Sequence, residues 1–136
     1  SPKYLLYPKE VKLPLYPTVN MLTGVTDTIV VVEGLYDALH LINNGITNVT
    51  CAFGTKMISM DNVYALFSPF MCAGVERVIL LMDGDSAGIS AASKIRKALE
   101  YKTDLLVETV ELGEGEDPGS LDAEQVEMLK NHLNSL

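Results

Sequence analysis

The sequence predicts an α/β fold in which a mostly parallel sheet of four strands is flanked by helices on both faces. Two observations predict this class. From residue 28 onward, short apolar runs alternate with longer segments whose apolar residues recur at helical spacing. In the first of these runs, TIVVVE, the apolar residues are consecutive rather than alternating, which is typical of a strand buried on both faces.

The individual elements follow from these patterns. Strands are expected at TIVVVE (28–33), NVTCAF (48–53), RVILLMD (77–83) and DLLVETVEL (104–112). Helical spacing predicts helices over 35–42, 60–70, 89–99 and 121–133. The second helix is expected to break near Pro69, because proline removes a backbone hydrogen bond. Residues 1–27 begin with a proline-rich stretch without a period and are predicted to form an extended lead-in, and residues 28–136 the domain itself.

Composition excludes several classes of protein. The chain has 136 residues and a formal net charge of −8, so free nucleic acid should be repelled unless metal ions or a basic partner intervene. No apolar run approaches the roughly 20 residues of a membrane span. The two cysteines form no CxxC motif, which argues against a structural zinc site and favours a reducing, cytoplasmic setting.

Acidic residues follow three of the expected strands. Glu33 ends the first strand, Asp83 and Asp85 end the third, and Asp117 lies in the loop after the fourth. The carboxyl ends of parallel strands meet at one edge of the sheet, where ligands bind in open α/β folds. We therefore expect these four acids to lie near one another.

The pair Asp83 and Asp85 predicts a metal site. In extended chain, side chains two residues apart point to the same side, and Gly84 between them lets another group approach the backbone. Carboxylates without nearby histidine or cysteine suit Mg²⁺ or Mn²⁺. An alternative remains open at this point: Asp85 or Ser86 caps the third helix and Asp83 is a solvated strand end.

Glu33 is either a metal ligand or general acid/base, or an acid favoured by the helix dipole in a first turn. Gly34 marks a sharp turn from strand to helix. Asp37, one turn further, either supports Glu33 or is a surface acid.

The segments VVVEGLYDAL, LLMDGDSAG and GEGEDPGSL closely resemble the three acidic motifs of the Toprim domain, a Rossmann-like fold. The EGxxDA form and the GEDPxSL ending resemble DnaG-type DNA primases, bacterial or phage, more than topoisomerases. The resemblance implies a metal-dependent nucleotidyltransferase that synthesises RNA primers for DNA replication. It implies catalytic roles for Glu33, Asp83 and Asp85, which together with Asp117 would hold two Mg²⁺ or Mn²⁺ ions.

The resemblance also implies partners. These are nucleoside triphosphates and, through the full-length protein, a single-stranded DNA template, an RNA primer and a replicative helicase, in the cytoplasm of a bacterial or phage-infected cell. Lys56 is the candidate phosphate contact, whereas Lys94, Arg96 and Lys97 are expected to form a solvated helix face. The chain is expected to be inactive as an isolated fragment.

One position departs from the family pattern. Cellular primases often carry a second acid two residues after the position of Asp117, where this chain has Gly119. Two alternatives to a primase stay open: a Toprim nuclease that hydrolyses phosphodiesters, and a metal- or nucleotide-binding module without chemistry of its own.

Overall fold

A parallel four-stranded sheet forms the centre of the protein, as a computed structural model describes it for residues 14–22, 26–52 and 58–136. All three pairings between neighbouring strands are parallel. The strand order is β2 (Val49–Cys51), β1 (Thr28–Val32), β3 (Arg77–Leu81), β4 (Leu106–Val110). The expected α/β class is confirmed.

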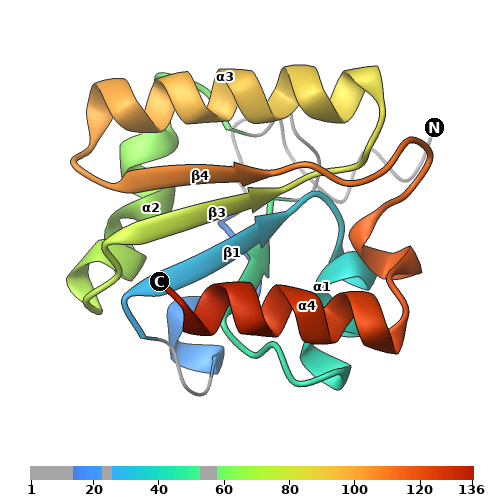
Figure 1. Ribbon diagram of the computed structural model, residues 1–136. Coiled ribbons are helices and arrows are strands. Elements are labelled where there is room, and N and C mark those ends of the chain that lie inside the picture. The colour runs from blue at the N-terminus through green and yellow to red at the C-terminus, as the bar shows by residue number, and fades with distance from the viewer. Residues whose placement is uncertain (1–13, 23–25, 53–57) are drawn as a thin grey trace, which may run out of the picture.

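Two helices cover each face of this sheet (Figure 1). On one face lie α1 (Leu35–Asn43) and α4 (Ala123–Asn134), and on the other lie α2 (Val63–Cys72) and α3 (Ser86–Lys102). The described ranges also contain two short 3₁₀ helices, η2 (Val19–Met21) and η4 (Pro118–Ser120), and η4 contacts α1. Every residue of β1 is buried, and successive residues pack alternately into the two cores, which explains its uninterrupted apolar run.

The expected break at Pro69 is wrong, because α2 continues through this residue to Cys72. Proline costs the helix one hydrogen bond and crowds the preceding turn. Phe67 and Phe70, on either side of it, are almost fully buried in the core beneath α2 and α3. Burying two aromatic side chains outweighs the local cost, since each contributes on the order of 2–3 kcal/mol.

The apolar face of α3 is also narrower than the sequence suggests. Ala92, Ile95 and Leu99 are buried as expected, but Ile89 is 55% exposed. In the first turn of α3, Gly88 rather than Ile89 is the buried residue.

Part of the predicted lead-in packs against the sheet. Leu15 is buried, and the backbone of Tyr16 forms an antiparallel bridge with Cys51 through two hydrogen bonds of 2.9 and 2.8 Å. The hydroxyl of Thr50 donates to the carbonyl of Pro17 over 2.9 Å. These contacts cover the outer edge of β2. None of the helices in the described ranges is both long and apolar enough to span a membrane.

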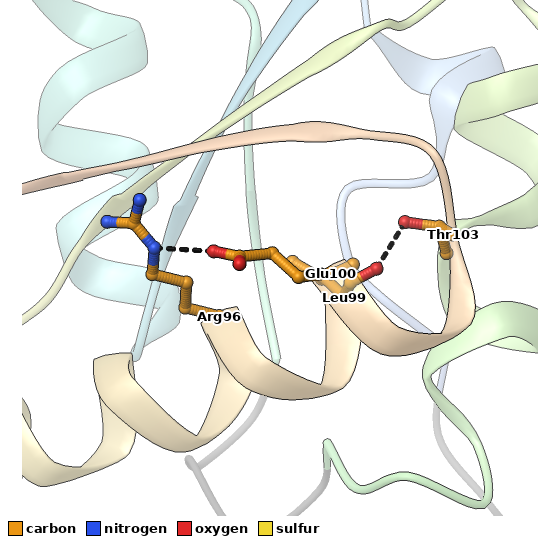
Figure 2. A network of polar contacts seen from close by, with 4 residues as sticks. All are labelled: Arg96, Leu99, Glu100 and Thr103. Atoms are coloured by element: carbon orange, nitrogen blue, oxygen red, sulfur yellow. Dashed lines mark hydrogen bonds and ion pairs between the residues drawn. The ribbon is translucent and has the colours of Figure 1, made fainter.

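The outer face of α3 is solvated, as expected. Lys94, Arg96 and Lys97 are exposed, and Arg96 pairs with Glu100 one turn later at 2.6 Å (Figure 2). An exposed pair of this kind stabilises a protein by about 0–1 kcal/mol. At the end of the helix, the hydroxyl of Thr103 donates to the carbonyl of Leu99 over 2.7 Å and closes the last turn.

The strand order determines where a ligand site lies. From β1 the chain crosses to β2 on one side and then returns to β3 on the other side of β1. Connections therefore diverge between β1 and β3, and in open α/β sheets ligands bind beyond the carboxyl ends of the strands at such a point. Glu33 follows β1 directly, and Asp83 lies two residues after β3.

Candidate metal centre

Glu33 connects the ends of the two central strands. Its Oε1 accepts a hydrogen bond of 3.2 Å from the backbone N–H of Asp83. This contact joins residues 50 positions apart in the chain and holds the Glu33 carboxylate beside the Asp83 segment. Glu33 therefore lies at the switch point between β1 and β3.

Asp83 carries the most perturbed carboxyl of the site. Its Oδ1 is buried and has no hydrogen-bond partner among the residues that the structure describes. Burial raises the pKa of the Asp83 carboxyl from the ordinary 3.8 to about 6, and the nearby carboxylates of Glu33, Asp37, Asp117 and Asp85 add to the rise. An ionised Asp83 therefore needs a cation close by, or it takes up a proton near neutral pH.

The Asp83 shift makes stability depend on pH. Because the folded protein keeps a proton that the unfolded chain has released, the free energy of unfolding falls as pH rises from about 4 to about 6. One pKa unit corresponds to about 1.4 kcal/mol, and partial exposure of Asp83 reduces the effect, so we expect a loss of about 1–2 kcal/mol. Urea unfolding without metal at pH 4.5 and 7 should show this loss in the wild type and little of it in Asp83→Asn. If the free energy of unfolding fell by the same amount between pH 4.5 and 7 in both proteins, the assignment to Asp83 would be contradicted.

Asp85 caps the helix that follows the metal-site loop. Its Oδ1 accepts a 2.7 Å hydrogen bond from the N–H of Gly88, and the residue is the N-cap of α3. The capping alternative that the sequence left open is thus confirmed for this oxygen. Asp85 also lies close enough to Asp83 to raise its pKa, so the cap holds a second carboxylate next to the buried one.

Asp37 and Asp117 approach the same edge from α1 and η4. Asp117 is the residue that precedes η4, and Asp37 lies in the first turn of α1. Oδ1 of Asp37 accepts a 2.9 Å hydrogen bond from the N–H of Gly119. Burial raises the pKa of Asp37, and the charge of Asp117 raises it further against the opposing effect of the Gly119 hydrogen bond. The four acids predicted from the sequence are therefore neighbours, and Asp37 joins them.

Two glycines let the loops of the site pack closely. The N–H of Gly84 donates to the carbonyl of Glu116 over 2.8 Å, and a Cβ on Gly84 would lie 2.0 Å from the carbonyl oxygen of Gly113. A Cβ on Gly88 would lie 2.1 Å from the carbonyl oxygen of Asp83. No real side chain tolerates such distances, so both positions require glycine. The sequence suggested the role of Gly84 but no signal marked Gly88 or the Glu116 carbonyl.

The site fits a hydrated divalent cation better than a closed protein cage. Within the described ranges, no group of three or more His, Cys, Asp or Glu side chains is arranged to hold a metal ion by itself. Mg²⁺ commonly takes one or two protein carboxylates and completes its shell with water or phosphate oxygens. The unpartnered buried oxygen of Asp83, surrounded by further carboxylates, suits such an ion. Lys56, the expected phosphate contact, lies outside the described residues.

Comparison with known families decides the relationship. Residues 27–111, more than half of the chain, match the Toprim domain family. The chain belongs to the Toprim family. Domains of this family generally bind divalent metal ions.

Among curated Toprim-containing proteins, the chain is similar to bacterial DNA primases. It is 36% identical over 95 residues to the DNA primase of Aquifex aeolicus, a match covering 65% of this chain and 16% of that protein. It is 34% identical over 97 residues to the DNA primase of Pseudomonas aeruginosa, with 70% and 14% covered. The chain thus spans less than a fifth of the length of these relatives.

Solved structures of primases share the observed fold. A DNA primase domain from Pseudomonas aeruginosa superposes with a TM-score of 0.65 at 32% identity and covers 79% of this chain and 33% of that one. A DnaG primase catalytic domain bound to single-stranded DNA superposes with a TM-score of 0.63 at 29% identity. This match covers 83% of this chain and 35% of that one. The primase fragment of the bacteriophage T7 primase-helicase, at 21% identity, shares the fold with a TM-score of 0.50.

Proposed function

We propose that this Toprim domain is the metal-binding catalytic module of a DNA primase, an enzyme that joins nucleotides into RNA primers for DNA replication. The observation that carries the proposal is the cluster of carboxylates at the switch point between β1 and β3. There Asp83 has a buried oxygen without a partner in the described part of the chain, and Glu33, Asp85 and Asp117 surround it. Similarity to primase catalytic cores supports the reaction class.

In the proposal, Glu33, Asp83, Asp85 and Asp117 hold Mg²⁺ or Mn²⁺, with two ions in the working site. When bound, such ions bring the triphosphate and the primer end together and stabilise the charge that develops during transfer. Asp83 supplies its unpartnered oxygen to them. Glu33 and Asp85 each use one oxygen for a backbone N–H, so their second oxygens would carry the ligand or proton-transfer role.

The proposed substrates and partners follow from the reaction. They are nucleoside triphosphates, a single-stranded DNA template and an RNA primer, with a replicative helicase as the associated protein. Lys56 is proposed to contact phosphate. The net charge of −8 supports a division of labour in which a basic surface elsewhere in the full-length protein holds the template.

The 136-residue chain by itself is expected to make no primers, although it should bind metal. Polymerisation needs template and primer end held in register, and a misplacement of about an ångström costs on the order of a hundredfold. With ten Lys and Arg against eighteen Asp and Glu, this chain has no excess of basic residues to hold a strand. A primer-synthesis assay with Mg²⁺ or Mn²⁺ tests this expectation by comparing the 136-residue chain with the full-length protein that contains it. Robust synthesis by the chain alone would contradict the division of labour, and cleavage of nucleic acid without synthesis by the longer protein would favour a nuclease.

Asp83→Asn is expected to weaken Mn²⁺ binding by about tenfold or more while the fold stays intact. The change removes the charge of the carboxylate with the unpartnered oxygen, and it also relieves repulsion in the metal-free protein. Asp85→Asn should also weaken Mn²⁺ binding while the cap of α3 persists, because asparagine caps a helix as well as aspartate does. Calorimetric titration with Mn²⁺ measures both.

The matched control for this titration is Asp104→Asn, which removes one negative charge at the opposite end of the sheet. Asp104 is exposed and lies before the start of β4. Its substitution should leave the affinity unchanged within error. If all three variants bound Mn²⁺ alike, overall charge and not the site would account for binding.

A further inference from the structure

Asp37 is not one of the proposed metal ligands, but it makes a hydrogen bond to a residue far away in the sequence. Its Oδ1 accepts the N–H of Gly119 at 2.9 Å across 82 positions of sequence. Gly119 lies in η4, two residues after Asp117. Asp37 therefore contacts the backbone of the segment that carries a proposed ligand.

This contact is one of three hydrogen bonds, each donated by a backbone N–H, that link the acid-bearing segments of the site. The N–H of Asp83 reaches Glu33, and the N–H of Gly84 reaches the carbonyl of Glu116. The N–H of Gly119 then reaches Asp37, which the first turn of α1 joins back to Glu33. Each acid-bearing segment is thereby fastened to the next. Of these links, the one through Asp37 is the hydrogen bond that ties η4 to α1.

The absence of a side chain at position 119 makes the contact possible. A Cβ there would lie 2.8 Å from Oδ1 of Asp37 and 3.3 Å from Oδ1 of Asp117. Gly119 does not have a positive φ, so its backbone conformation does not itself require glycine. The steric requirement therefore comes from the two carboxylates.

We infer that Asp37 is a positioning residue that sets the place of Asp117 by accepting the Gly119 N–H, and that it is not itself a metal ligand. This inference rests on the proposed function, because it assumes that Asp117 serves the metal centre. A hydrogen-bond acceptor needs only an oxygen, whereas a ligand for Mg²⁺ or Mn²⁺ works through its negative charge. The two roles respond differently to a neutral substitute of the same shape.

Asp37→Asn and Asp37→Ala separate the roles. Asparagine keeps an oxygen that can accept the Gly119 N–H, so it should retain Mn²⁺ affinity within about threefold, whereas alanine should lose about tenfold or more. Gly119→Ala, which disturbs the same bond from the other side, should resemble Asp37→Ala. In ¹H–¹⁵N spectra, the Gly119 amide proton should stay downfield in Asp37→Asn and move upfield in Asp37→Ala. Urea unfolding establishes that each variant is folded at the temperature of the titration.

Two results would overturn the inference. Equal loss of Mn²⁺ affinity in the asparagine and alanine variants would show that Asp37 acts through its charge, and full affinity in the alanine variant would show that the link has no role. Failure of the proposed function is a separate result. If the wild-type chain bound no Mn²⁺, that function would fail, and the Gly119 amide would still decide whether Asp37 holds the loop.

Discussion

Glu33→Gln is expected to lower primer synthesis by the full-length protein about a hundredfold or more, with the domain still folded. Glutamine keeps an oxygen that can accept the N–H of Asp83, so the link between β1 and β3 should persist. What the substitution removes is the negative charge at the switch point. The loss should therefore appear in the rate of nucleotide transfer rather than in stability.

The experiment compares initial rates of primer synthesis at saturating nucleotide and Mg²⁺, together with unfolding curves. Glu76→Gln is the matched control, because Glu76 is exposed at the opposite end of β3. It should synthesise primers at the wild-type rate. Synthesis by Glu33→Gln at that same rate would remove Glu33 from the catalytic group, whereas a purely structural role would show as a parallel loss of stability.

Gly88→Ala should destabilise the domain by about 2–4 kcal/mol, a large effect for a single methyl group. A Cβ at this position would lie 2.1 Å from the carbonyl oxygen, 2.9 Å from the carbonyl carbon and 3.1 Å from the nitrogen of Asp83. These are backbone atoms that cannot rotate away. Relief requires α3 to move from the loop that carries Asp83, so metal binding should weaken along with stability.

Helix propensity alone predicts the opposite sign for Gly88→Ala, since alanine is favoured over glycine inside a helix by about 1 kcal/mol. Gly34→Ala is the comparison variant, because a Cβ there would meet only Oδ2 of Asp37 at an ordinary 3.5 Å. It should cost less than about 1 kcal/mol. Denaturant unfolding of both variants measures the contrast, and equal stabilities would contradict the close packing of α3 on the Asp83 loop.

The elements of the fold follow from local patterns. The buried run at Thr28–Val32 and the acid directly after it could be placed from the sequence, since apolar residues at consecutive positions are typical of a strand covered on both faces. The continuation of α2 through Pro69 could not be predicted from the sequence. Local preference favours a break there, and the burial of Phe67 and Phe70 is a property of the whole core.

The candidate site divides in the same way. That Glu33, Asp83 and Asp117 end or follow strands is visible in the sequence, and parallel pairing brings such residues to one edge. That Asp85 caps α3 could be decided only from the Gly88 N–H that its carboxylate accepts. The unpartnered oxygen of Asp83 depends on burial by several segments at once, so no spacing rule signals it.

The sequence by itself determined the α/β class, the four strands, and the carboxylate character of the candidate site. The tertiary structure alone decided the strand order and hence the switch point between β1 and β3, the raised pKa of Asp83, and the contact of Asp37 with Gly119. The physical reason is the distance along the sequence over which each interaction acts. Periodicity and capping act within a few residues, whereas the field at Asp83 and the hydrogen bond across 82 positions arise only when crossover connections bring distant segments to one edge.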